Sequence, residues 1–501
     1  MVRNRALSVL LVLGCSMAMV SCPEWWGGGN LVGDKTVLKE KLAEAGFVVD
    51  DKGVFTAVNP VLQFCEGTLP NALGQNADTP YLLFKMDPTA SGFYSWGFQL
   101  RPDDALVFIG KTPPEAVYFS FTAFLNVRYY PELQKAKMLM ANLGDSLNQC
   151  VIKTSGSAKG NPFDADTVVI VTADKATETK VRESLDKAGY SNRIVNTMVI
   201  PSDTVRLGTD PQDDRMCILT RCAFFKDPAA GAAYLGWGDV PEGETVSTAG
   251  VIWRVTPDTP APEKPVEPLC EPPLRVHGTG YPEFDLWPDV EALRAAILAA
   301  YPDYDAFEFD TEQFLAEGAE AIQRGINVLA PSRDTVYLRT HGTFTLAEDE
   351  FVVVYGVNHA AAGKALYSNA VLYAMDPVDN STFQFEPNLA DGDIWRAFAG
   401  IGSINSVEDM QDSVQAFLPA DAVPVNEHGE DLLYARKIKH TCDVADPVTC
   451  TSIPASICER MPQNEFNVAF RAYVEPETLV GPAYNELVYD RVIKFTPKAV
   501  R

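Results

Sequence analysis

SRDTVY, residues 332–337, repeats the pattern of NADTPY, residues 76–81, and both copies contain Asp-Thr-x-Tyr. Each copy is followed by an apolar run that ends in glycine, and then by an apolar segment rich in aromatic residues. The runs are ALVFIG at 105–110 and FVVVYG at 351–356, and the segments are 116–125 and 365–374. Three landmarks in the same order predict two related domains that arose by duplication.

A proline-rich segment, TPDTPAPEKPVEPLCEPP at 256–273, separates the two copies. Its seven prolines cannot build the interior of a helix or sheet, and they favour a stiff, extended connector. The sequence therefore predicts a first domain at 34–255, a linker at 256–273 and a second domain at 274–501.

The remaining patterns predict an α+β fold, in which two related mixed α/β domains contain largely antiparallel sheets. Runs of β-branched and aromatic residues predict strands, and apolar residues at helical spacing predict helices. The predicted strands include 105–109, 117–124, 167–171, 216–225, 351–357 and 366–373. The predicted helices include 36–45, 132–143, 176–188, 289–299, 311–324 and 407–417. Segment 167–200 has a strand–helix–strand pattern without glycine in its first turn, so a phosphate-binding loop is not expected.

The N-terminus combines basic residues with a short apolar stretch. Arg3 and Arg5 precede Ala6 to Val20, which is too short for a membrane-spanning helix and typical of a secretory signal. The stretch ends in Met19-Val20-Ser21-Cys22, which resembles the lipobox of exported bacterial lipoproteins, although methionine replaces the usual leucine. Val12-Leu13-Gly14-Cys15 matches less well because it leaves a very short apolar segment.

The lipobox resemblance implies a signal peptide at 1–21, lipidation of Cys22, a flexible tether at 22–33 and a place in the bacterial cell envelope, at the outer membrane. The alternative is an ordinary signal peptide with Cys22 merely near the cleavage site. Trp25 and Trp26 would lie among lipid headgroups or pack on the folded body. No later stretch reaches about 18 uninterrupted apolar residues, so we expect the remainder to be soluble.

The NADTPY stretch itself is similar to the Asn-x-Asp-Thr-x-Tyr stretch of certain bacterial envelope proteins of unknown function. The second copy has Ser332 where the first has Asn76. This resemblance implies an envelope setting and no particular activity.

The composition excludes some classes of partner. The chain has 67 acidic and 41 basic residues, for a net charge of −26. Such a surface repels nucleic acid, so we expect no nucleic-acid partner. The only membrane association that we expect is through the lipid anchor.

Motifs for cofactors and metals are absent from the sequence. There is no P-loop, no H-E-x-x-H, no G-x-S-x-G elbow and no G-x-G-x-x-G after a strand, so we expect no cofactor. No two histidines lie three to five residues apart, so we expect no local metal site. The histidines are His277, His341, His359, His428 and His440.

The cysteines predict structural disulfides, because an even number follows Cys22 in a chain expected to be exported and none forms C-x-x-C. They are Cys65, Cys150, Cys217, Cys222, Cys270, Cys442, Cys450 and Cys458. Four precede the linker and four lie within or after it, which predicts two disulfides within each half. In the second half we expect Cys442 to pair with Cys450, across a turn-forming loop, and Cys270 to pair with Cys458.

In the first half, Cys217 and Cys222 lie in one predicted strand. Five residues of strand span far more than the Cα separation that a disulfide permits. We therefore expect Cys217 and Cys222 to pair with Cys65 and Cys150, in an order that the sequence leaves open.

Candidate site residues follow the second Asp-Thr-x-Tyr copy, in PSRDTVYLRTHGTF at 331–344. In a strand, Tyr337, Arg339 and His341 share the face opposite the core residues, and Asp334 points with the core set. The first copy has leucine and lysine where the second has Arg339 and His341. The pair could hold an anion, with a hydrogen bond from Tyr337 and with His359 nearby if two strands pair.

Three interpretations of these residues remain open: a solvated strand face, a ligand pocket or a catalytic site. We expect a membrane-anchored binding or interaction module for a small ligand, with anions as the favoured class, rather than an enzyme. The alternative is a cofactor-independent hydrolase centred on Arg339 and His341.

Overall fold

The computed structural model describes residues 31–69, 72–87, 96–238, 243–260, 264–265, 267–377, 396–443, 450–460 and 465–499. The predicted signal peptide, Cys22 and the tether up to residue 30 lie outside these ranges. Helices and strands are mixed along the chain, and the sheets are largely antiparallel, which confirms the predicted α+β class. Within the described ranges, no helix is both long and apolar enough to cross a membrane.

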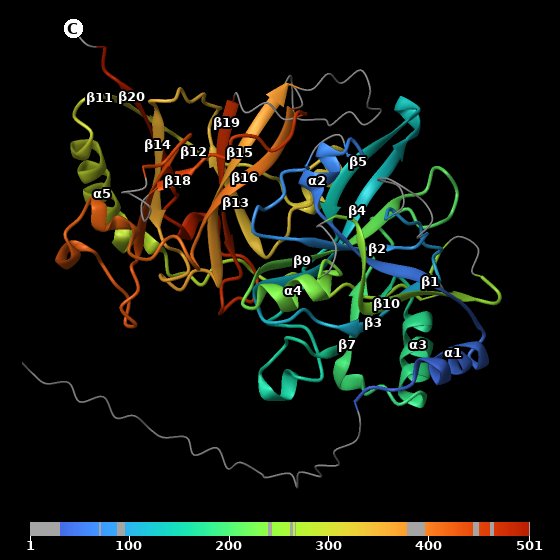
Figure 1. The fold of residues 1–501 in the computed structure, drawn as a ribbon. Helices are drawn as coiled ribbons and strands as arrows, with labels where there is room; N and C mark the ends of the chain where they lie inside the picture. Colours follow the sequence, from blue (N-terminus) through green and yellow to red (C-terminus); the bar gives the residue numbers. More distant parts are fainter. Residues whose placement is uncertain are drawn as a thin grey trace, which may run out of the picture.

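The first half forms one ten-stranded sheet, in the order β5-β4-β9-β2-β1-β10-β3-β7-β8, with β6 paired to β4 (Figure 1). Its strands are β1 (Phe47–Val58), β2 (Tyr81–Lys85), β3 (Ala105–Lys111), β4 (Ala116–Tyr130), β5 (Lys135–Asn142), β6 (Leu147–Asn148), β7 (Asp166–Thr172), β8 (Val195–Val199), β9 (Arg215–Phe225) and β10 (Thr245–Pro257). Its helices are α1 (Lys35–Glu44), α2 (Pro60–Cys65), α3 (Lys175–Lys187) and α4 (Pro228–Leu235). Strand β10 includes Thr256 and Pro257, so the sheet extends two residues into the predicted linker.

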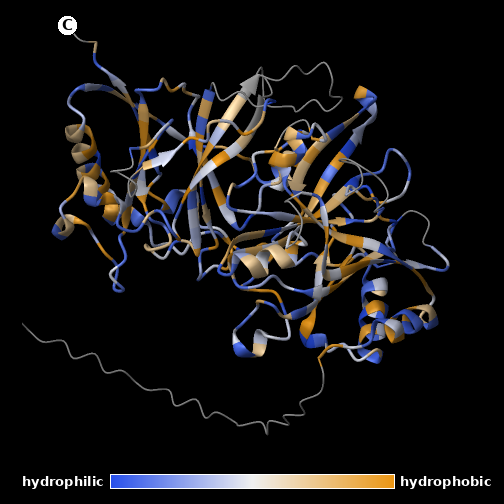
Figure 2. Cartoon of the chain, viewed as in Figure 1, coloured by the Kyte–Doolittle hydropathy of each residue, from blue (hydrophilic) through white to orange (hydrophobic). Residues whose placement is uncertain are grey.

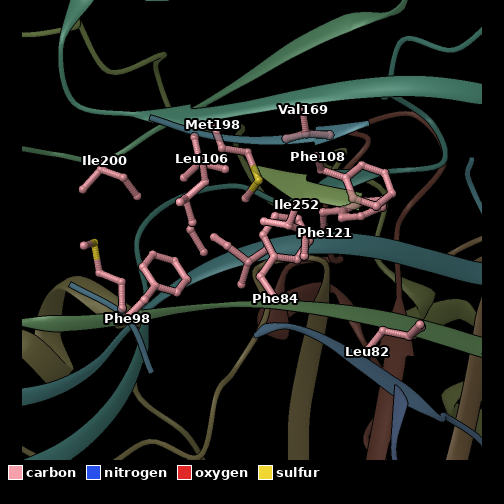
Figure 3. Close-up of a cluster of buried hydrophobic side chains, with 14 of the residues drawn as sticks. Leu82, Phe84, Phe98, Leu106, Phe108, Phe121, Val169, Met198, Ile200 and Ile252 are labelled. Atoms are coloured by element: carbon pink, nitrogen blue, oxygen red, sulfur yellow. The ribbon is translucent and has the colours of Figure 1, made fainter. Parts of the chain in front are cut away.

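This sheet curls around its own core. Phe108 on β3 and Phe121 on β4 lie five positions apart in the strand order, which would separate them by about 24 Å in a flat sheet. Their ring centroids are only 5.4 Å apart. Phe84 and Ile252 point into the same cluster (Figure 3). Helices α1 and α3 pack on the other face, and both carry hydrophobic and hydrophilic residues (Figure 2).

The second half contains two five-stranded sheets, in the orders β11-β20-β14-β17-β18 and β12-β13-β19-β15-β16. The strands are β11 (Tyr304–Phe309), β12 (Thr311–Gln313), β13 (Thr335–Thr340), β14 (Phe351–Val357), β15 (Tyr367–Pro377), β16 (Arg396–Asn405), β17 (Leu433–Lys439), β18 (Cys450–Ser452), β19 (Glu465–Tyr473) and β20 (Arg491–Pro497). Residues of both sheets share one core, and α5 (Trp287–Ala300) packs on the outer face of the first sheet. A short helix, α6 (Gly318–Arg324), precedes β13.

The two halves have the same strand order. Strands β5-β4-β9-β2 correspond to β16-β15-β19-β13, and β10-β3-β7-β8 correspond to β20-β14-β17-β18. The bulged strand β1 pairs with both β2 and β10, and its counterpart is divided at Asp310 into β12 and β11. Because β1 is continuous and β11–β12 is not, one half has a single sheet and the other has two.

Most of the predicted elements form where the sequence places them. All six predicted strands are present, as are the helices at α1, α3 and α5. The predicted helix at 132–143 is wrong, because this segment forms β5 in a hairpin with β4 and edge pairing overrides helix propensity. The helix predicted at 311–324 is confined to α6. The helix predicted at 407–417 is also wrong, since the segment forms turns and a short 3-10 helix over Ser413–Ala416.

The disulfides differ from the prediction in one essential respect. Cys442 pairs with Cys450, as predicted, but Cys65 pairs with Cys458 across the two halves. The predicted bonds of Cys270 to Cys458, and of Cys217 and Cys222 to Cys65 and Cys150, are therefore wrong. The prediction assumed that each half closes its own disulfides, whereas α2 of the first half packs against the second.

Cys217 and Cys222 were predicted to form disulfides, but both are free thiols. Cys217 and Cys222 are five residues apart on β9, so their side chains enter two different cores on opposite faces of the sheet. Both thiols are buried and free, and burial raises the pKa of Cys217 to about 12. Cys150 and Cys270 are exposed and free.

Candidate functional site between the two halves

The strongest candidate site lies where the two halves meet, and each half contributes one buried arginine to it. Arg221 lies on β9 opposite Tyr81 of β2, and Arg471 lies on β19 opposite Tyr337 of β13. The two arginines therefore occupy equivalent positions in the repeat. They are 4% and 6% exposed, respectively.

Each arginine donates to a backbone carbonyl of the opposite half. Nη2 of Arg221 donates to the carbonyl of Ala330 at 2.5 Å, and Nη2 of Arg471 donates to that of Gly74 at 3.0 Å. Gly74 and Ala330 are equivalent in the repeat, because each lies four residues before the aspartate of its Asp-Thr-x-Tyr copy. The interface is thus an exchange of the same contact in both directions.

The two accepting loops share a strained backbone. Leu73 and Gly74 have φ of 60° and 63°, and Leu329 and Ala330 both have φ of 58°. A left-handed conformation costs free energy in residues other than glycine, and it persists only when surrounding contacts enforce it. The same conformation occurs in both copies of the repeat, which indicates that the contacts at this interface enforce it.

Tyrosine hydroxyls lie beside the arginines and retain a proton to donate. The Tyr81 hydroxyl accepts from the backbone N–H of Asn76 at 2.8 Å, and the Tyr337 hydroxyl accepts from that of Ser332 at 2.8 Å. The Tyr473 hydroxyl accepts from the side chain of Asn76 at 3.1 Å. Among the described residues, none of these three hydroxyls has an acceptor for its own proton.

The aspartate of each Asp-Thr-x-Tyr copy accepts hydrogen bonds from side chains of the opposite half. Asp334, which is completely buried, accepts from the Tyr118 hydroxyl at 2.8 Å and from the Asn148 amide at 2.9 Å. Asp78 accepts from Tyr367 and Asn369 in the equivalent manner. Burial raises the pKa of Asp334, and the hydrogen bonds from Asn148 and Tyr118 oppose this rise.

A cavity of about 80 Å³ lies against the arginines and tyrosines. Its polar lining includes Tyr81, Arg221, Tyr337, Arg471 and Tyr473. Its apolar lining includes Val58, Leu69, Leu73, Leu83, Trp96, Met140, Leu219 and Leu329. None of the described lining residues is Asp, Glu, His or Cys.

The two guanidinium groups have no counter-ion in the part of the chain that the structure describes. Nη1 of Arg221 and Nη1 of Arg471 are buried and have no hydrogen-bond partner among the described residues. Burial lowers the pKa of each arginine, but the nearby tyrosine oxygens together raise it by more than burial lowers it. Both groups therefore remain charged. Burial also raises the pKa of Tyr337, which keeps its hydroxyl protonated. Two cations and three hydroxyl donors therefore line one cavity, and none of the described residues there supplies an anion to accept from them.

Of the residues predicted from sequence, Tyr337 lines this cavity and the others lie elsewhere. Arg339 donates to Glu312 at 2.8 Å and stacks over Phe314, and His341 binds the same carboxylate at 2.8 Å. The His341 side chain is 70% exposed. Arg339 and His341 thus share one partly exposed carboxylate. The beginning of the strand is buried: Thr335 donates to the carbonyl of Ala472 on β19, and Tyr337 lines the cavity together with Arg221 of the first half.

His359 is buried in a separate ion-pair cluster. Its Nδ1 lies 2.8 Å from Glu283 and its Nε2 lies 3.2 Å from Asp490. Burial lowers the pKa of His359, but the two carboxylates outweigh it and raise the pKa to about 10. Both ring nitrogens are occupied, so His359 does not join Arg339 or His341 in one pocket. The geometry of these three residues does not favour the hydrolase hypothesis over ligand binding.

Arg221, Arg471 and Tyr81 line the cavity but were not among the site residues predicted from the sequence. A signal for them was present, because each half places an arginine inside an otherwise apolar strand, in ILTRCAFF at 218–225 and in VAFRAYV at 468–474. A buried strand position seldom carries arginine without a partner. The same residue type at both equivalent positions would have been a fourth landmark of the repeat.

In the described ranges, no group of three or more His, Cys, Asp or Glu side chains is arranged to hold a metal ion. No protein-family model matches the sequence, and no curated protein sequence matches it. Among solved structures, the chain is similar to a putative uncharacterized protein from Burkholderia cenocepacia, at 11% identity and a TM-score of 0.36, over 91% of this chain and 85% of the other. It is similar to the VPA0106 protein from Vibrio parahaemolyticus at 8% identity and a TM-score of 0.36, over 91% and 97%.

Proposed function

We propose that the protein is a lipid-anchored binding module of the bacterial cell envelope, which holds a small anionic ligand in the cavity between its two halves. One observation carries the proposal: Arg221 and Arg471 are buried beside an open cavity, and Nη1 of each has no partner among the described residues. An unpaired buried charge is costly, and a bound anion would compensate it.

The surrounding donors support an anion rather than another class of ligand. Tyr81, Tyr337 and Tyr473 each have a proton to donate, and the described lining residues include no carboxylate that would repel a negative charge. Hydrogen bonds from guanidinium groups to anions are among the strongest that proteins form. Binding would also connect the halves, because the donors come from both.

Titration of the full chain with acetate and with inorganic phosphate tests this proposal. We expect saturable heat release at constant ionic strength, and we expect no such signal with an uncharged analogue such as acetamide. Absence of saturable binding by both anions would contradict the proposal. The Arg339→Leu variant provides the control, because Arg339 already has Glu312 as its partner and lies outside the cavity. This variant should bind as the wild type does.

The lipid anchor is a separate part of the proposal, supported by the lipobox resemblance at Cys22. We expect Cys22→Ser to move the protein from the membrane fraction to the aqueous fraction, because the variant would lack the acyl chains that hold it at the bilayer. Cell fractionation followed by immunoblotting measures the distribution. Cys15→Ser is the matched control and should remain in the membrane fraction. Equal retention of both variants would contradict lipidation at Cys22.

A further inference from the structure

We infer that the ligand of the central cavity is an amphiphile with one compact anionic head and one apolar chain. The inference rests on the proposed function and adds the chemical class of the ligand. It follows from the arrangement of polar and apolar residues along β2 and β9, which form one wall of the cavity.

Two neighbouring residue pairs on this wall differ in character. Tyr81 lies opposite Arg221. Leu83, two residues after Tyr81 on β2, lies opposite Leu219, which is two residues before Arg221 on the antiparallel strand β9. Residues two apart on a strand share a face, so the polar pair and the apolar pair line the same cavity side by side. A ligand whose charged group contacts Arg221 therefore extends over leucine.

The apolar end continues beyond this pair. Trp96 and Met140 belong to the same buried cluster as Leu83 and Leu219, and both line the cavity. Leu69 of the loop that follows α2 also lines it. Burial of a methylene group against such a wall is favourable, whereas a second charge there would have no partner.

The equivalent strand positions of the second half do not repeat this leucine pair. The positions equivalent to Leu83 and Leu219 are Arg339 and Ala469, which lie opposite each other on β13 and β19. Arg339 is bound to Glu312 at the surface. The charged end of the cavity is thus shared by both halves, whereas among the described residues the leucine pair that continues it lies on the strands of the first half.

A chain-length series on the full protein tests the inference, with acetate, hexanoate and decanoate as probes below their aggregation concentrations. We expect affinity to rise by about four-fold for each methylene group that enters the cavity. Decanol and decyltrimethylammonium should bind at least 100-fold more weakly than decanoate, because they lack the negative head. Decyl phosphate distinguishes a phosphate head from a carboxylate head by its affinity relative to decanoate.

The outcomes separate this inference from the proposed function. Binding of acetate with no gain for decanoate would overturn the inference and leave the proposed function standing. If neither carboxylate nor phosphate bound at any length, the proposed function itself would fail. Equal binding of decanol and decanoate would overturn the anionic head.

A cavity-filling variant gives an independent test. Leu219→Phe places a larger side chain beside Arg221 without removing charge, and we expect decanoate affinity to fall at least ten-fold. Leu133→Phe is the matched control, because Leu133 is exposed in the β4–β5 turn. Circular dichroism and thermal melting establish that both variants fold. A folded Leu219→Phe variant with unchanged decanoate affinity would place the chain elsewhere and overturn the inference.

Discussion

Replacement of Arg221 or Arg471 by methionine is expected to weaken anion binding by about 30-fold or more, and replacement of both is expected to abolish it. Each substitution removes a buried cation and its unpaired Nη1 donor from the cavity. Loss of one charged partner from a desolvated contact costs about 2–5 kcal/mol, and 1.4 kcal/mol corresponds to a factor of ten. Calorimetric titration of the wild type and the three variants measures the effect.

The stability of the unliganded protein separates ligand binding from a purely structural role. Methionine removes the hydrogen bond from Nη2 to Ala330 or Gly74, but it also removes an uncompensated buried charge. The two effects have opposite signs, so we expect the free energy of unfolding of the single variants to stay within about 1–2 kcal/mol of the wild type. Arg339→Met is the control for both measurements. Unchanged anion affinity in the folded double variant would show that the arginines only join the two halves.

The second large effect concerns His359. Substitution of this residue by glutamine is expected to lower the free energy of unfolding by about 3–5 kcal/mol, since Glu283 and Asp490 would remain buried without a cation between them. Urea unfolding at pH 7 with the disulfides intact measures the loss. His341→Gln is the matched control: His341 is largely exposed, so its loss should change stability by at most about 0.5 kcal/mol. Equal midpoints for the two variants would show that the buried imidazolium does not stabilise the fold.

The same cluster predicts a pH dependence with a definite sign. The pKa of His359 is raised from 6.5 to about 10, so the folded state binds the proton more tightly than the unfolded state does. The resulting stabilisation is fully present below pH 6.5 and is lost as the pH rises toward 10. We expect the urea midpoint of the wild type to fall between pH 7 and pH 10 more steeply than that of His359→Gln. Parallel profiles would contradict a charged His359 at neutral pH.

The sequence did not predict which residues of the outer face of β13 are covered by the first half. Alternation along 334–343 correctly separated Tyr337 and Arg339 from Leu338, but it could not tell which part of the outer face meets solvent. Tyr337 is buried by the first half, whereas the same face reaches solvent four residues later at His341. Periodicity gives the face of a strand, and only the packing of distant segments decides what covers it. The sequence prediction selected Arg339 because this position differs between the two halves. The cavity is instead lined by Arg221 and Arg471, which occupy equivalent positions in the two halves.

The sequence by itself determined the α+β class, most of the strands and the Cys442–Cys450 disulfide, and it contained the landmarks of the repeat. These features depend on residues close in the chain, where spacing alone limits the geometry. Only the tertiary structure decided that the two halves interlock, that Cys65 bonds Cys458, and that Arg221 and Arg471 meet at one cavity. Contacts between residues hundreds of positions apart depend on how whole sheets pack, and no local pattern encodes that choice.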